Sequence, residues 1–260
     1  MSESTFGGGG LIVAHRGASA VTAENTLAAF EAAIAAGADA VEFDVRMTAD
    51  DAAVVMHDPD VARTTDGTGL VREMTLRDLK RLRIPLPGGG ETEVPLLDEV
   101  LRICSDRVGI DVEIKNIPGE PDFDPERERA VEATIRALDD VAFSGAVFLS
   151  SFNPFSIARS RALDASIPTG LLTDPTVDAD VAVTFASEQG HAWALPFIDR
   201  VEEAGPTGLV ERARARDMQV GTWITDDPGR IVRLLAAGVD AVATNDPEAA
   251  VAARRAGGPA

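Results

Sequence analysis

The sequence predicts an α/β fold, a (β/α)8 TIM barrel with a small insertion after an early strand. Short apolar, valine-rich runs alternate with helix-like stretches along nearly all of the 260 residues. About eight such βα units in about 250 residues are what this barrel requires. Polar residues follow the apolar runs at many separate points in the chain. A doubly wound open sheet, the alternative fold, gathers its functional residues at one switch point, so the wide distribution favours the barrel.

The strand candidates are apolar runs of the kind expected for strands that are buried on both faces. Because the carboxyl ends of parallel strands meet at one mouth of a barrel, we expect the polar side chains at these ends to converge there. The runs cover residues 11–14, 40–45, 53–56, 108–114, 146–150, 168–172, 192–195, 219–224 and 240–244.

The helix candidates lie between these strands. Residues 25–37 end in Gly37, a typical helix C-cap. Residues 124–138 offer Asp124 as an N-cap and Pro125 in the first turn. The same Asn-Pro or Asp-Pro beginning marks residues 153–163, 226–238 and 246–257.

One long segment, residues 57–98, interrupts this alternation. It contains "DGTG" and "PGGGE" turns and one short helix pattern at residues 75–82. We interpret it as a small insertion, and loops of this length in compact domains usually serve function. Residues 11–256 are predicted to form a single barrel domain, preceded by a flexible N-terminal tail at residues 1–10 without signal-peptide features.

Composition excludes several classes of partner. The chain has 24 Lys plus Arg against 43 Asp plus Glu, a net charge of −19, and no basic patch. Nucleic acid and anionic membrane surfaces are therefore not expected partners. Cys104 is the single cysteine, which excludes an intrachain disulfide. No apolar run reaches the length of an integral membrane segment, and the predicted location is the cytoplasm.

Three carboxylates predict a metal site. Glu42 and Asp44 lie two residues apart in one strand candidate, so their side chains point to the same side. Two like charges buried together are costly unless salt bridges to arginines or a divalent cation neutralise them. Glu113 has the same placement on another strand and favours the cation. Carboxylates without thiolates predict a hard ion, Mg²⁺ or Ca²⁺.

Two of the three histidines are candidate proton-transfer groups. His15 and His57 each follow a strand candidate and stand beside a charged residue. Imidazole suits proton transfer near neutral pH. A metal-bound phosphodiester needs one group that takes a proton from the nucleophile and another that gives one to the leaving alkoxide, and this pair can share those tasks. His191 precedes its strand and is interpreted as structural or peripheral.

Cations and aromatic residues complete the candidate site. Arg16 and Lys115 either balance the carboxylates or bind an anionic phosphodiester through guanidinium and ammonium contacts. The chain has only two lysines, and this scarcity favours a functional role for Lys115. Phe152 and Trp223 are candidate substrate-binding walls of the pocket, with a plain core position as the alternative.

The motifs together resemble those of the glycerophosphodiester phosphodiesterases. They keep the family's order over roughly residues 11 to 250, and the ordered set is much more specific than any single string. They include "AHRG" (14–17), "ENT" (24–26), "VEFDV" (41–45), "HD" (57–58), "RTTDGTG" (63–69), "EIK" (113–115), "SSFNP" (150–154) and "WITDD" (223–227).

The resemblance implies metal-dependent hydrolysis of glycerophosphodiesters, such as glycerophosphocholine or glycerophosphoethanolamine, to glycerol 3-phosphate and an alcohol. Such an enzyme belongs to glycerol and lipid metabolism, and its partner is a small-molecule substrate. The oligomeric state is not predicted. Asn245 stands where the family usually has an aspartate. The implied roles are acid/base catalysis for His15 and His57, metal binding for Glu42, Asp44 and Glu113, phosphate binding for Arg16 and Lys115, and support from Glu24 and Asn25.

There are three alternatives to this function, and the first of them is another phosphodiesterase specificity of the same site. A phosphodiesterase that acts on lysophospholipids would use the same catalytic set. A non-catalytic barrel that serves as a binding protein would have lost a histidine or a metal carboxylate, and none is missing here. A metal-dependent barrel lyase acting on a carbonyl substrate would not need two histidines at strand ends together with a phosphate clamp.

Overall fold

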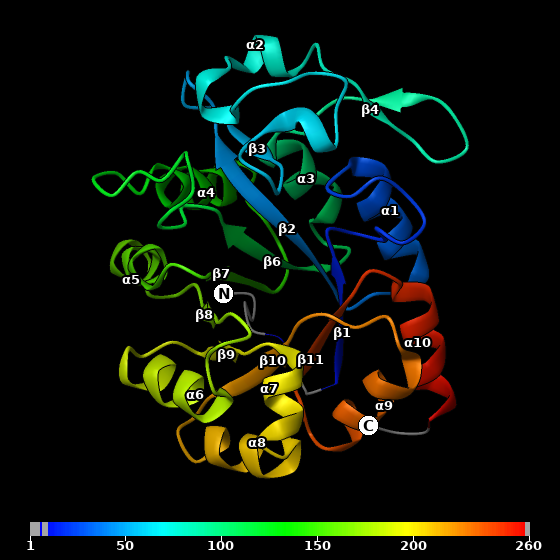
Figure 1. The fold of residues 1–260 in the computed structure, drawn as a ribbon, viewed down its shortest axis with the longest axis vertical. Coiled ribbons are helices and arrows are strands. Elements are labelled where there is room, and N and C mark those ends of the chain that lie inside the picture. Colours follow the sequence, from blue (N-terminus) through cyan, green and yellow to red (C-terminus); the bar gives the residue numbers. More distant parts are fainter. Residues whose placement is uncertain (1–5, 7–9, 258–260) are drawn as a thin grey trace.

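The computed structural model describes residue 6 and residues 10–257, so most of the predicted N-terminal tail lies outside the described residues. Nine strands form one sheet, of which β3 is antiparallel, and the other eight are parallel and close into a barrel (Figure 1). Pairing of β1 with both β11 and β2 closes it. The predicted TIM barrel is confirmed. Its strands are β1 (Leu11–His15), β2 (Ala40–Met47), β6 (Gly109–Ile114), β7 (Val147–Ser151), β8 (Thr169–Leu172), β9 (Trp193–Leu195), β10 (Gln219–Thr222) and β11 (Ala241–Thr244).

Helices surround the barrel, and among the described residues none is long and apolar enough to cross a membrane. Several follow the predicted start signals. The side chain of Asn153 accepts a hydrogen bond from the backbone N–H of Phe155 at the start of its helix. The helices are α1 (Leu27–Ala36), α3 (Leu97–Cys104), α4 (Arg129–Asp140), α5 (Pro154–Leu163), α6 (Ala179–Glu188), α7 (Ile198–Glu203), α8 (Pro206–Arg214), α9 (Pro228–Ala236) and α10 (Pro247–Ala256).

The predicted start of α4 is wrong. Asp124 does not cap this helix, which begins at Arg129. The Asp124 carboxylate instead accepts hydrogen bonds from the backbone N–H groups of Glu126 and Arg127. Local Asp–backbone bonds of this kind compete with helix formation, so the acidic residue closes a separate turn before the helix.

Along β2, alternate side chains point either into the hydrophobic core or toward the inside of the barrel. Val41, Phe43 and Val45 are fully buried in the hydrophobic layer between the sheet and the helices. Glu42 and Asp44 alternate with them and therefore face the inside of the barrel. The apolar layer thus holds the strand in the register that places the two carboxylates inside.

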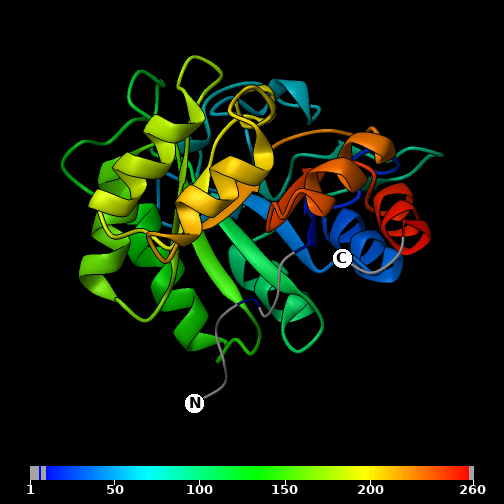
Figure 2. The same cartoon turned by 90° about the horizontal axis from the view of Figure 1, so that it is seen from below.

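The insertion has its own small apolar core and lies at one end of the barrel, shown in cyan in Figure 2. Val54, Met56, Val61, Val71 and Leu79 are among the buried residues of this core. The insertion follows β3 (Ala53–Val55) and contains two 3-10 turns (Val61–Arg63 and Val71–Glu73), α2 (Leu76–Leu79), β4 (Ile84–Pro85) and β5 (Glu91–Thr92).

The run at residues 53–56 is a strand, but its expected role in the parallel barrel is wrong. β2 continues to Met47, and the chain then turns and pairs β3 antiparallel with β2. The backbone N–H of Met56 donates to the carbonyl oxygen of Asp44 at 2.9 Å. His57 therefore reaches the mouth from a strand that runs back toward it, and not from the carboxyl end of a barrel strand.

Candidate active site

The mouth of the barrel contains a cavity of about 290 Å³, and the residues singled out from the sequence converge on it. Asp44 and Asn25 are buried behind the cavity wall, and Glu24 contacts Arg16. The candidate residues that line the cavity are His15, Arg16, Glu42, His57, Glu113, Lys115, Phe152 and Trp223.

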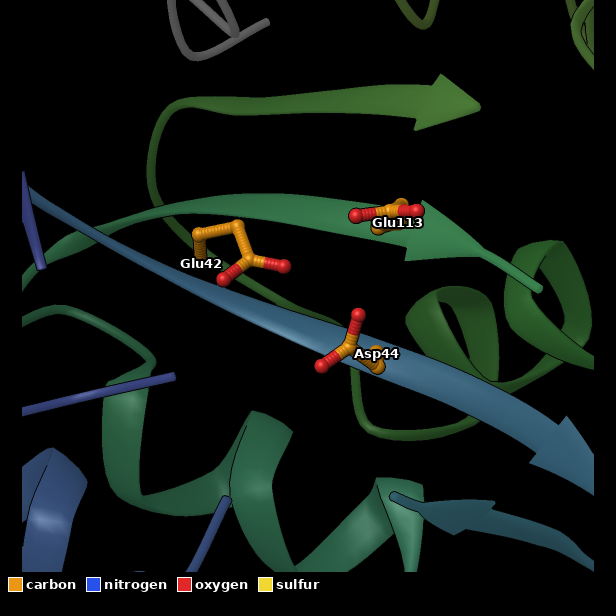
Figure 3. A group of neighbouring side chains, drawn as sticks. All are labelled: Glu42, Asp44 and Glu113. Carbon is orange, nitrogen blue, oxygen red and sulfur yellow. The ribbon is translucent and has the colours of Figure 1, made fainter. Parts of the chain in front are cut away.

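The three predicted carboxylates lie together between two adjacent strands (Figure 3). In the pairing of β2 with β6, Asp44 is opposite Glu113 and Glu42 is opposite Asp111. One carboxylate oxygen from each of Glu42, Asp44 and Glu113 lies within 4.8 Å of the other two. Parallel register and strand alternation therefore build a compact group of acids from residues about 70 positions apart.

Two of these acids have cationic partners. The Lys115 Nζ atom lies 2.5 Å from Glu113 Oε1 and 3.0 Å from Asp44 Oδ1. Arg16 Nε is 3.4 Å from Asp44 Oδ2, which also accepts a 2.7 Å hydrogen bond from Asn25 Nδ2. The nearby charges of Lys115 and Arg16 hold the pKa of Asp44 well below its ordinary value, in spite of its burial.

Glu42 lacks such a partner for one oxygen. Its Oε2 atom accepts a 2.9 Å hydrogen bond from the backbone N–H of Arg16, but Oε1 has no hydrogen-bond partner among the described residues. Burial and the like charges of Asp44 and Glu113 raise the pKa of Glu42 well above its ordinary value. An unpartnered buried carboxylate oxygen beside two further carboxylates suits a hard divalent cation.

His15 is held in one tautomer by Asn245. Its Nδ1 atom lies 2.8 Å from Asn245 Oδ1, while Asn245 Nδ2 donates to Asp226 Oδ2 at 2.9 Å. The amide oxygen can only accept, so His15 Nδ1 carries the proton and Nε2 is free to accept one. Burial, followed by the charge of Arg16, lowers the pKa of His15 to about 4.

His57 is connected to Arg16 by a chain of ion pairs at the mouth. The Nδ1 atom of His57 lies 2.6 Å from Asp58 Oδ1, and Asp58 accepts from Arg63 Nε at 2.5 Å. Arg63 donates two further bonds to Glu24, which also accepts from Arg16 at 2.9 Å. Burial is the largest cause that lowers the pKa of His57. Glu24 therefore links Arg16 to the segment that carries His57.

Asp111 is a site residue that the sequence reasoning missed. It lies opposite Glu42 in the sheet, lines the cavity and accepts a 2.6 Å hydrogen bond from Ser150 Oγ. Burial raises its pKa well above the ordinary value. Asp111 and Glu113 lie two positions apart on β6, so the rule that predicted Glu42 and Asp44 to share a face would have found Asp111 as well.

Arg46 is a second missed residue, and its side chain is fully buried. Its Nε atom donates to the backbone carbonyl oxygen of His57 at 2.7 Å. The two terminal nitrogens donate to Asp122 at 2.5 Å and to Glu120 at 2.8 Å in the β6–α4 loop. Arg46 thereby ties the segment that carries His57 to the loop after β6. Because its three acceptors are distant in the sequence, no local pattern signals this contact.

Two aromatic side chains form one wall of the cavity. Phe152 and Trp223 meet edge to face with ring centroids 5.2 Å apart, and the ring centroid of Phe197 lies 5.1 Å from that of Trp223. Trp223 Nε1 donates to the backbone carbonyl oxygen of Leu195, which fixes the indole. Lys115 Nζ lies 5.9 Å from the centre of the Phe152 ring. These rings have the position expected of pocket walls.

Comparison with known proteins agrees with this geometry. The sequence matches the glycerophosphoryl diester phosphodiesterase family over residues 15–249. It is 33% identical over 255 residues to a glycerophosphodiester phosphodiesterase of Caldanaerobacter subterraneus subsp. tengcongensis, covering 95% of this chain and 99% of the relative.

Solved structures with the same fold include a phosphodiesterase of Oleispira antarctica in complex with the product sn-glycerol-3-phosphate, with a TM-score of 0.81 and 26% identity over 94% of this chain and 96% of that chain. A glycerophosphodiester phosphodiesterase of Thermotoga maritima has a TM-score of 0.74 and 26% identity, and the match covers 93% and 97% of the two chains. The chain therefore belongs to the glycerophosphoryl diester phosphodiesterase family and is an enzyme of that class.

Proposed function

We propose that the enzyme hydrolyses glycerophosphodiesters with small polar alcohols, such as glycerophosphocholine and glycerophosphoethanolamine, to glycerol 3-phosphate and the alcohol. The observation that carries this proposal is one cavity lined by two imidazoles and a group of acids with an unpartnered oxygen. The Oleispira relative, which binds sn-glycerol-3-phosphate, supports the assignment of the product.

One divalent cation, Mg²⁺ or Ca²⁺, is the proposed cofactor, and Glu42, Asp44 and Glu113 would hold it. When bound, such an ion polarises a phosphoryl oxygen and stabilises the negative charge of the transition state. The charges of Lys115 and Arg16 favour the ionised form of Asp44, and they offset part of the increase that burial causes in the pKa of Glu113. When the cation binds the carboxylates, the N–H groups of Lys115 and Arg16 are available to donate to phosphate oxygens.

His15 and His57 are the proposed proton-transfer pair. With its pKa near 4, the ring of His15 is neutral at pH 7, and Asn245 leaves its Nε2 atom free to accept a proton. Asp58 orients His57 through Nδ1 in the same way. One imidazole takes the proton of the nucleophile, and the other gives a proton to the oxygen of the leaving alcohol.

A coupled assay for glycerol 3-phosphate tests this function. Metal-stripped enzyme is offered glycerophosphocholine or glycerophosphoethanolamine with Mg²⁺, Ca²⁺ or EDTA. We expect turnover with a cation and none in EDTA. His15→Ala and His57→Ala should each lower kcat by roughly 10²- to 10⁴-fold, the usual contribution of acid–base catalysis.

The third histidine provides the matched control. His191 lies outside the cavity, where its Nδ1 atom pairs with Thr169 Oγ1 at 2.8 Å. His191→Asn should keep the turnover of the parent enzyme. Unchanged activity in His15→Ala or His57→Ala, or full activity of stripped enzyme in EDTA, would refute the assigned roles.

A further inference from the structure

The deep end of the catalytic cavity contains a polar group that the proposed reaction does not use. Asp111 comes two residues before Glu113 on β6, so it lies one step farther from the mouth of the barrel. It is opposite Phe148 of β7, while Glu113 is opposite Ser150. The Asp111 side chain therefore enters the cavity beneath the pair formed by Asp44 and Glu113.

One carboxyl oxygen of Asp111 is occupied, and the other is available. Ser150 Oγ donates to Asp111 Oδ1 at 2.6 Å, which orients the carboxyl group. Oδ2 has no hydrogen-bond partner among the described residues, and the side chain lines the cavity. The hydroxyl of Thr222, which also lines the cavity, already donates to the carbonyl oxygen of Pro196 at 2.9 Å. Apart from the proposed metal ligands, Asp111 Oδ2 is thus the polar atom that the described lining offers to a ligand at this depth.

The rest of the deep end is apolar. Phe148 stacks on Trp193 with ring centroids 5.2 Å apart, which closes this part of the cavity. A hydroxyl group buried here needs a partner, because an unpaired buried polar group is costly. One free carboxyl oxygen among apolar walls therefore suits a short carbon chain that carries a hydroxyl group. The walls are formed by Val13, Phe148, Leu195, Gly221 and Ala241.

The two ends of the cavity differ in a way that orients the substrate. The mouth has the aromatic rings of Phe152 and Trp223, which suit a quaternary ammonium group such as that of choline. The proposed substrates share glycerol and differ in the alcohol, so the constant half fits the closed end and the variable half fits the open mouth. With phosphorus at the acids, the terminal hydroxyl of glycerol lies farthest from phosphorus and reaches deepest.

We propose that Asp111 determines specificity for the glycerol half of the substrate, through a hydrogen bond between its Oδ2 atom and the terminal hydroxyl of glycerol. This inference rests on the proposed function and names the residue that selects glycerol esters from other phosphodiesters. A hydroxyl group both donates and accepts, so the contact forms with an ionised or a protonated carboxyl group. An ester without this hydroxyl leaves Oδ2 unpaired in the occupied cavity.

Choline release from two substrates measures the contribution of the hydroxyl. They are glycerophosphocholine and 2-hydroxypropyl phosphocholine, which lacks only the terminal hydroxyl. We expect the parent to prefer glycerophosphocholine by about 10- to 100-fold in kcat/KM, the range that one unpaired buried hydrogen-bonding group costs. This preference is a ratio of two rates from the same preparation, so it does not depend on the fraction of folded enzyme.

Three variants locate the preference. Asp111→Leu replaces both carboxyl oxygens by methyl groups, and the preference should fall to about threefold or less because the hydrogen bond is lost. Asp111→Asn keeps groups that bond to a hydroxyl, so it should retain a preference of about tenfold or more. Thr222→Val is the matched control, since it removes a hydroxyl of the same cavity that Pro196 already engages. It should retain the preference of the parent.

Binding of sn-glycerol 3-phosphate and of 2-hydroxypropyl phosphate, measured by calorimetry with Mg²⁺ or Ca²⁺, repeats the comparison without turnover. If glycerophosphocholine is not hydrolysed, the proposed function fails, and the preference in binding still decides the role of Asp111. A preference that is present in the parent and lost in Asp111→Leu supports the inference in either measurement.

Three results would overturn it. The first is a parent enzyme that treats the two members of each ligand pair alike. The second is an Asp111→Leu variant that retains the parent's preference, as expected if the alcohol and not the glycerol occupied the deep end. The third is an equal loss of preference in Thr222→Val, which would assign the effect to the shape of the cavity.

Discussion

Asn245 shows how one side chain can set the protonation of a candidate catalytic group. Its amide is oriented by two bonds to Asp226, one from Nδ2 and one from the backbone N–H. The oxygen therefore faces His15, where it accepts a hydrogen bond without adding a charge. Burial and the charge of Arg16 outweigh the Asn245 hydrogen bond and the charge of Asp44, so the pKa of His15 falls to about 4 and the ring stays neutral over a wide pH range.

Asn245→Asp places a carboxylate against His15 and should raise its pKa. A neutral base works only above its pKa, so the parent enzyme should keep kcat/KM as the pH falls from 7 to 5. The variant should lose activity within that range. A pH profile of glycerol 3-phosphate release checks this, with Asn245→Ala as the uncharged control. Superimposable profiles of the parent and the aspartate variant would contradict the role of Asn245.

The β2–β3 hairpin is the element that brings His57 to the site. Sequence reasoning found the strand and the histidine, because both are local features, but it could not find the direction of β3. That direction depends on the turn after Met47 and on pairing across the sheet. Arg46 was missed for the same reason, since Glu120, Asp122 and the carbonyl of His57 approach it only in the folded chain.

Arg46→Met should weaken both the fold and the catalysis. It removes a buried guanidinium and leaves two carboxylates and a carbonyl without their donor, a loss of about 3 kcal/mol in the free energy of unfolding. His57 loses its anchor, so kcat should fall more than KM changes. Urea denaturation and steady-state kinetics measure the two effects.

Arg46→Lys is the matched control for that variant. An ammonium keeps the charge but cannot reach three separate acceptors, so this variant should be intermediate in stability and in kcat. Parent-like kcat in Arg46→Met, together with a lowered stability, would limit Arg46 to a structural role.

At the scale of the whole molecule, the barrel was predictable because each βα unit carries its own signals. Apolar runs, Asn-Pro and Asp-Pro helix starts and the cap at Gly37 are all local. The interior was harder to predict. Pairing of β2 with β6 brings Asp111 beside Glu42, and that neighbour depends on the register of two strands about 70 residues apart. The barrel interior therefore holds several buried acids close together. Their burial and mutual repulsion lower the free energy of unfolding when no cation is bound.

This cost predicts how stability depends on pH in metal-free enzyme. The pKa of Glu42 is raised in the folded state, so its contribution to stability is present at acidic pH and is lost as the pH rises above the ordinary glutamate range. The lowered pKa of Asp44 acts only in stronger acid. A bound cation should therefore raise Tm more at pH 8 than at pH 5.

Thermal unfolding in EDTA and in Mg²⁺ or Ca²⁺ measures this difference, with Glu42→Gln as a control that should lessen the pH dependence of the metal-free protein. An equal increase in Tm at both pH values would contradict the raised pKa of Glu42 as the origin of this difference.

The most direct measurement follows cation occupancy and turnover in the same samples. Stripped enzyme is dialysed against increasing Mg²⁺ or Ca²⁺, bound ion is determined by atomic emission, and glycerol 3-phosphate release from glycerophosphocholine is assayed. We expect the rate to rise in proportion to occupancy, to saturate at about one ion per chain, and to need more cation in Glu113→Gln. Full turnover without bound ion, or a bound ion that brings no gain in rate, would contradict a metal-assisted hydrolysis at this mouth of the barrel.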